Sequence, residues 1–114
     1  MEKSLQDLID LVEKYKLVLS IVEGKKDKAS LEKLGFENII TMEGKSTVEV
    51  VESVDAKTVM ILTDFDVEGQ KKYAALKSAF SERGVNVDDS FRKAVRKTHI
   101  ICFEGLANFV QRDV

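Results

Sequence analysis

The 114-residue sequence contains no proline and only one cysteine, and each scarcity excludes a class of protein. A single cysteine, Cys102, cannot form an internal disulfide, which excludes a disulfide-stapled scaffold and fits a reducing compartment. Without proline, and without a stretch rich in glycine and serine, the chain shows no linker between domains. We therefore expect one domain that spans residues 1–114.

Long apolar runs and a surplus of one charge are also missing. No apolar run approaches the ~20 residues that a membrane helix needs, and the N-terminal "MEKSLQDLID" carries acids where a signal peptide would be basic and then apolar. Eighteen basic and 20 acidic residues leave a net charge of −2, which argues against a surface coated for non-specific nucleic-acid binding. We expect a cytoplasmic protein without a membrane contact.

The apolar residues that are present alternate between strand-like and helix-like segments. Short β-branched runs predict strands at residues 17–22, 38–42, 58–63 and 98–103. Helical spacing predicts helices at residues 3–16, 27–35, 46–54, 68–84, 90–97 and 105–110, although the β-branched residues of 46–54 also suit a strand. Continuous apolar strands between helices indicate an α/β, Rossmann-like domain, with a mainly parallel four-stranded sheet and helices on both faces.

Acidic residues follow two of these predicted strands. Glu23 comes directly after the first strand, and Asp64 and Asp66 come directly after the third, in "TDFD". Sites in open α/β sheets form beyond the carboxyl ends of the strands, and neighbouring strands lie about 4.8 Å apart. A strand order of 2-1-3-4 would bring the three carboxylates together. Hard oxygen ligands without histidine or cysteine suit Mg²⁺ or Mn²⁺ rather than zinc.

A simpler explanation applies to part of this pattern. Acids are common where a strand leads into a helix, because a carboxylate there accepts hydrogen bonds from the free amides of the first turn. Asp66 or Glu68 could cap the helix predicted at residues 68–84 in this way. The joint occurrence of acids after two strands favours the metal site over capping alone.

These residues also resemble a known family. "VEGKKD", followed some forty residues later by "TDFDVEG", resembles the Toprim domain, which topoisomerases, bacterial primases, OLD-type nucleases and ribonuclease M5 share. The resemblance covers residues 17–103. It implies that Asp64 and Asp66 are Mg²⁺ ligands and that Glu23 is a ligand or a general acid/base. Gly24 and Gly69 match the turn glycines of the family.

The sequence departs from the larger members of that family. Type IA topoisomerases usually read DxDREGE, whereas Val67 and Gln70 replace the arginine and the last glutamate here. The chain has no room for the domain that carries a topoisomerase tyrosine, or for the further modules of a primase. It is most similar to small stand-alone Toprim proteins and to the Toprim region of ribonuclease M5, which implies RNA as a substrate.

Basic residues close to the acidic motifs suggest a nucleic-acid surface. Five are candidates for phosphate contacts: Lys25, Lys26, Arg92, Lys93 and Arg96. A solvated charged face explains them equally well. The sequence leaves open a nuclease that acts on RNA or DNA and a non-catalytic module that binds nucleic acid with a partner protein. A third alternative, a phosphotransfer receiver domain, would need paired acids after the first strand and a lysine in the last strand, and both are missing.

Overall fold

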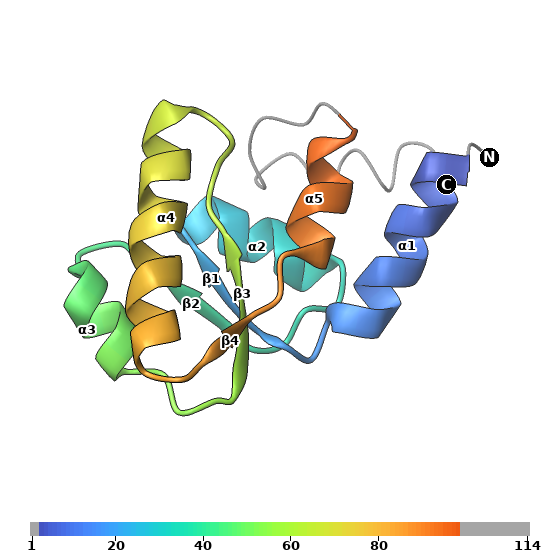
Figure 1. Ribbon diagram of the computed structural model, residues 1–114. Helices are drawn as coiled ribbons and strands as arrows, with labels where there is room; N and C mark the ends of the chain where they lie inside the picture. The colour runs from blue at the N-terminus through green and yellow to red at the C-terminus, as the bar shows by residue number, and fades with distance from the viewer. Residues whose placement is uncertain (1–2, 99–114) are drawn as a thin grey trace.

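The computed structural model describes residues 3–98 and shows a four-stranded parallel sheet with helices on both faces (Figure 1). The strands are β1 (Leu19–Val22), β2 (Ile39–Thr41), β3 (Thr58–Leu62) and β4 (Asn86–Val87). The helices are α1 (Lys3–Tyr15), α2 (Lys25–Lys33), α3 (Thr47–Glu52), α4 (Val67–Glu82) and α5 (Ser90–Arg96). The strand order is β2-β1-β3-β4, which confirms the predicted order 2-1-3-4.

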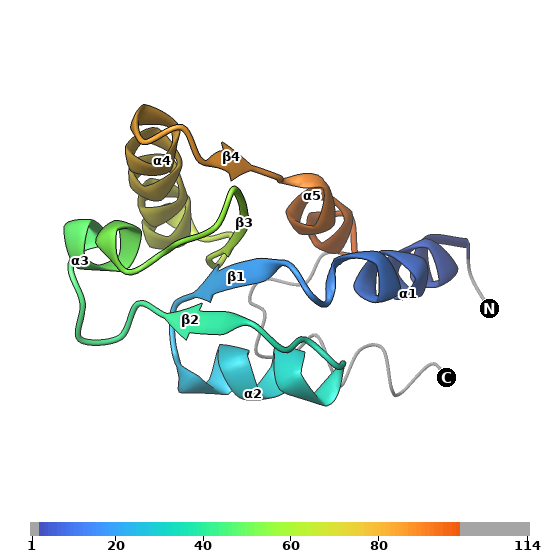
Figure 2. The ribbon, with the colours of Figure 1, turned by 90° about the horizontal axis from the view of Figure 1, so that it is seen from below.

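The alternation of side chains along β3 divides the core into two clusters, one on each face of the sheet. Met60 and Leu62 face the first cluster, to which α1, α2 and α5 contribute. Val59 and Ile61 face the second cluster, which α3 and α4 cover. Figure 2 shows the same division, with α3 and α4 on one side of the strands and the other helices on the opposite side. Both faces of the sheet are therefore buried, as its continuous apolar strands predict.

The local signals for helix ends behave as expected. Gly35 and Gly84 follow α2 and α4 with φ angles of 101° and 76°. Both angles lie in the left-handed region, where glycine is favoured. The ambiguous segment 46–54 forms α3, because the Ser46 side chain accepts a hydrogen bond from the Glu49 amide and Glu49 bonds back to Ser46. This capping box starts a helix where β-branched residues alone would also suit a strand.

The fourth strand differs from the prediction. Within residues 3–98 it is β4, which pairs with Thr58 and Val59 only, and no strand was expected at this position. A two-residue strand carries almost no periodic signal, so sequence patterns cannot reveal it. Thr98 lies in the turn after α5, and the rest of the strand predicted at 98–103, like the helix predicted at 105–110, lies outside the described residues.

None of the helices within residues 3–98 is both long enough and apolar enough to cross a membrane.

Candidate functional site

The parallel register aligns the carboxyl ends of β1 and β3. Val22 lies opposite Leu62 in the sheet, so Glu23 and Asp64 leave the same edge from adjacent strands. The Glu23 carboxylate reaches across this edge, where its Oε2 accepts a hydrogen bond of 2.7 Å from the backbone amide of Asp64. The structure thus brings these two predicted residues together.

Lys72 is the second partner of Glu23. Its Nζ lies 2.7 Å from Glu23 Oε1, and the Glu23 side chain is 18% exposed. The hydrogen bond to Glu23 is the main reason that the pKa of Lys72 is raised. Sequence reasoning missed this residue, because Lys72 lies on α4, 49 positions after its partner. Its spacing after Gly69, one turn into the helix that follows the acidic motif, is the one signal that could have identified it.

Asp64 lies in an acidic cluster with Glu23, Asp27 and Asp66. Its side chain is half-buried, and its Oδ1 atom is buried without a hydrogen-bond partner among the described residues. Burial, followed by the negative charges of Glu23, Asp27 and Asp66, raises the pKa of Asp64 to about 6. Such a group is stabilised by a proton or by a cation.

Asp66 caps a helix, which is the simpler explanation that the sequence pattern suggested for it. It is the N-cap of α4, and its Oδ1 accepts a hydrogen bond of 2.7 Å from the Gly69 amide. Capping by Asp66 is therefore confirmed, whereas Glu68 lies inside the first turn. The Asp66 side chain remains exposed, and a capping carboxylate keeps lone pairs that can bind a cation.

The two predicted turn glycines serve other purposes. Gly24 is the N-cap of α2, with a φ of −146° that any residue adopts. Gly69 is the third residue of α4, and a Cβ there would overlap the backbone carbonyl of Asp64. The Thr63 hydroxyl also donates to the Gly69 carbonyl over 2.7 Å. Gly69 thus allows α4 to pack directly on the chain that carries Asp64.

Two further acids lie beside Glu23. Asp27 is buried, and its Oδ2 accepts a hydrogen bond of 3.1 Å from the Gly24 amide. Glu43, which sequence reasoning missed, accepts a hydrogen bond of 3.2 Å from the Lys25 amide. Both carboxylates stabilise the start of α2, where helix amides lack other acceptors.

The donor set suits a hard divalent cation, but its arrangement does not gather three ligands. The cluster offers only carboxylate oxygens, which Mg²⁺ and Mn²⁺ prefer, and the buried Asp64 Oδ1 has no partner within residues 3–98. Across the same residues, however, no three histidine, cysteine, aspartate or glutamate side chains are grouped as a metal site. The amides and Lys72 already engage Glu23 and Asp66.

Arg92 departs most from its predicted position. We expected it on an exposed basic surface, as a candidate for phosphate contacts, but it is only 7% exposed. Its guanidinium lies between two rings, 4.5 Å from the centroid of Phe65 and 4.6 Å from that of Tyr73. Its Nη2 donates to the Asp64 carbonyl at 3.2 Å and lies 3.5 Å from Thr63 Oγ1. Arg92 therefore stabilises the backbone of the acidic motif through its hydrogen bond to the Asp64 carbonyl.

The other basic candidates stay at the surface. Lys25 and Lys26 are exposed at the start of α2, and Lys93 and Arg96 are exposed on α5. Lys93 forms an ion pair of 3.2 Å with Asp89. These exposed positions are compatible with phosphate contacts.

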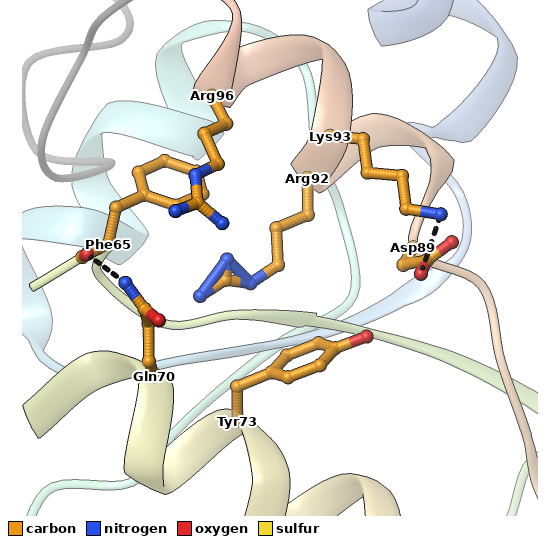
Figure 3. A pocket seen from close by; sticks show the side chains of 7 residues that line it. All are labelled: Phe65, Gln70, Tyr73, Asp89, Arg92, Lys93 and Arg96. Carbon is orange, nitrogen blue, oxygen red and sulfur yellow. Dashed lines mark hydrogen bonds and ion pairs between the residues drawn. The ribbon is translucent and has the colours of Figure 1, made fainter. Parts of the chain in front are cut away.

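A cavity of about 280 Å³ separates α4 from α5, beside the segment that carries the acidic motif (Figure 3). It is lined by Phe65, Gln70, Tyr73, Asp89, Arg92, Lys93 and Arg96.

Comparison with known proteins gives consistent matches. The family model of the Toprim domain matches residues 18–90. A UPF0292 protein of Methanocaldococcus jannaschii is 32% identical over 98 residues, which cover 79% of this chain and 77% of that protein. A UPF0292 protein of Pyrococcus furiosus is 40% identical over 68 residues, covering 58% and 51% of the two chains. A solved structure of a putative protein from Aquifex aeolicus superposes with a TM-score of 0.80 at 31% identity, covering 90% of this chain and 98% of that one.

Proposed function

The chain belongs to the Toprim domain family, and from this premise we propose that it is a metal-dependent protein that processes nucleic-acid phosphodiesters. The observation that carries the proposal is the acidic cluster at the carboxyl edge of β1 and β3, where burial, followed by the negative charges of the neighbouring acids, raises the pKa of Asp64 to about 6. Clustered carboxylates at this edge, with one buried oxygen unpaired among the described residues, are suited to a Mg²⁺ or Mn²⁺ ion.

The proposal assigns each acid a role. Asp64 and Asp66 would hold the ion, which when bound would neutralise charge on a phosphate oxygen. Glu23 would take a proton from an attacking water or deliver one to the leaving oxygen. For that role Lys72 has to release Glu23 Oε1, which it holds at 2.7 Å. The freed ammonium group is then available to a phosphate of the substrate.

A nuclease that acts on RNA or DNA is the first form of this proposal. The similarity of the motifs to the Toprim region of ribonuclease M5 favours RNA. We place the protein in the cytoplasm, where the expected nucleic acid and a protein partner would meet it.

A binding module that works with a partner protein is the second form, and a specific observation favours it. Both oxygens of Glu23 are engaged, one by the Asp64 amide and one by Lys72. As placed, both oxygens of this carboxylate already accept hydrogen bonds from the protein, so neither is directed at an attacking water. In a binding module the same cluster would hold a nucleic-acid phosphate through the metal, and the partner would perform the chemistry.

A cleavage and binding assay with Mg²⁺ or Mn²⁺ tests the proposal on structured RNA, single-stranded DNA and supercoiled plasmid. We expect the Glu23→Gln variant to bind but not to cleave, and the Asp64→Asn/Asp66→Asn double variant to lose Mn²⁺ binding in calorimetry. Glu82→Gln is the matched control, because Glu82 is an exposed acid at the far end of α4. Binding without cleavage under either metal supports the module, and wild-type Mn²⁺ binding in the double variant contradicts the metal site.

A further inference from the structure

The cavity between α4 and α5 is built around a buried positive charge. Arg92 is more than nine-tenths buried, and its guanidinium is stacked between Phe65 and Tyr73. Figure 3 shows this side chain reaching between the two rings from α5. A charge in such a position is costly unless hydrogen bonds and counter-charges satisfy it.

The protein satisfies that charge only in part. Nη2 contacts the Asp64 carbonyl and the Thr63 hydroxyl. Arg92 Nε is buried and has no partner among the described residues. Neither contact comes from a carboxylate, so within residues 3–98 Arg92 has no paired acid in direct contact. The Arg92 guanidinium therefore lacks a negatively charged partner in direct contact among the described residues.

A second guanidinium faces the same cavity. Arg96 lies one helical turn after Arg92 on α5, and its guanidinium is 6.0 Å from the centroid of the Phe65 ring. No ion pair of Arg96 is found in the described part of the chain. The positive charge of Arg96 is also one reason that the pKa of Arg92 is lowered, after the larger effect of burial. Two like charges that converge without an acid between them favour an anion.

The remaining charges of the cavity cancel. Asp89 is its one acidic residue, and Asp89 is paired with Lys93 at 3.2 Å. Gln70 is held by a hydrogen bond of 2.8 Å from its Nε2 to the Phe65 carbonyl. The net charge of the lining is therefore positive, and it comes from the two arginines. Because guanidinium groups bind phosphate oxygens in a fixed planar geometry, a phosphate suits this pair better than a smaller anion.

We propose that this cavity binds one phosphate group of a nucleotide, separately from the acidic edge, with Arg96 as the contacting residue and Arg92 as a buried counter-charge. The proposal rests on the proposed function and deepens it, because the cavity and the acidic cluster share one segment of the chain. Phe65 lines the cavity, and in sequence it lies between Asp64 and Asp66. A nucleic-acid strand at the acidic edge would place another of its phosphates here. A free nucleotide presents the same chemistry.

Calorimetric titrations in EDTA test the cavity without any metal. The probes are a single-stranded RNA decamer, AMP and inorganic phosphate, added to the full chain. We expect Arg96→Gln to weaken binding of the decamer by roughly tenfold, the loss of one charge-assisted contact. Arg83→Gln is the matched control, because Arg83 is an exposed arginine at the far end of α4, and it should change binding by less than about twofold.

A variant with the opposite effect strengthens the test. Asp89→Asn removes the acid of the cavity and frees Lys93, so binding should become roughly threefold tighter. Asp89 makes no side-chain hydrogen bond as the N-cap of α5, so this change should leave the helix intact. A weaker complex in Asp89→Asn would overturn the proposal.

The probes identify the occupant. Tighter binding of the decamer than of AMP indicates a strand, whereas equal binding of AMP and the decamer indicates a free nucleotide. Equal losses in Arg96→Gln and Arg83→Gln, or no binding of any probe by the wild-type chain, would overturn the proposal. The titrations in EDTA measure the cavity alone, whereas Mn²⁺ calorimetry measures the metal site, so failure of the metal site and failure of the cavity give different results.

Discussion

Asp64 is the residue through which the acidic cluster should make the stability of the fold depend on pH. Its pKa is raised from 3.8 to about 6 by burial and by neighbouring acids, so the folded chain binds this proton more tightly than the unfolded chain. The stability that this proton contributes is complete below pH 4 and is lost as the pH rises through 6. In the metal-free protein, Asp64→Asn should therefore become more stable relative to wild type between pH 4 and 7.

The expected gain is on the order of 1 kcal/mol at pH 7, since solvent screens a half-buried carboxyl group. Urea denaturation at several pH values in EDTA measures it. Asp55→Asn, at an exposed acid in the loop after α3, is the control. Parallel stability curves for Asp64→Asn and wild type would contradict the clustering.

Lys72 provides a second test at the residue scale, one that depends on the proposed metal. Its ammonium group neutralises Glu23 from 2.7 Å, and so it competes with a cation for that carboxylate. Lys72→Met should bind Mn²⁺ roughly two- to fivefold more tightly, because a partly exposed ion pair contributes up to about 1 kcal/mol. Lys71→Met is the control, since Lys71 pairs with Glu68 instead. Equal changes in both variants would show only the effect of net charge.

The start of α4 determines the arrangement of the site at the element scale. Glycine inside a helix usually costs about 1 kcal/mol relative to alanine, so Gly69→Ala would be stabilising if the helix alone mattered. Here a methyl group would overlap the Asp64 carbonyl, and α4 would have to move away. We expect Gly69→Ala to lose about 1 to 3 kcal/mol of unfolding free energy.

Chemical denaturation measures that loss, with Ser78→Ala at an exposed position of the same helix as the control. A gain in stability for Gly69→Ala would mean that the close approach is dispensable.

Asp66 tests the cap of the same helix. Its carboxylate accepts the Gly69 amide at 2.7 Å, and loss of a cap typically costs about 1 kcal/mol. Asp66→Ala should therefore lower the melting temperature, whereas Asp66→Asn should keep most of the stability, because asparagine caps nearly as well. Both variants would remove the metal carboxylate, so Mn²⁺ binding should weaken in each. If asparagine costs as much stability as alanine, the cap is not the main contribution of Asp66.

At the scale of the whole molecule, a net charge of −2 limits nucleic-acid binding to local contacts. If a strand lies along the cavity and the acidic edge, the protein contacts about two or three of its phosphates. For a single strand, the slope of log K against log salt should then be about −2 or shallower. Arg96→Gln should make the slope less negative by about 0.7. A slope near −5 would instead indicate a broad basic surface.

The sequence by itself determined the parts of this protein that local patterns encode. Apolar runs of strand length, the glycines after α2 and α4 and the Ser46 capping box specify elements through contacts a few residues apart. The order of two parallel strands then follows, and with it the placement of Glu23 and Asp64 at one edge. The match to the Toprim domain over residues 18–90 rests on the same motifs.

Tertiary structure alone decided which side chains complete the site. Lys72 meets Glu23 over 49 positions, and Arg92 meets the Asp64 carbonyl over 28. In sequence, Arg92 belongs to a run of basic residues that reads as a solvated face. Its burial arises because α4 and α5 bring Tyr73 and Arg92 together beside Phe65. A helical pattern records which residues share a face, but the neighbour that the face meets depends on how separate elements pack, and that packing is settled by contacts across the whole chain.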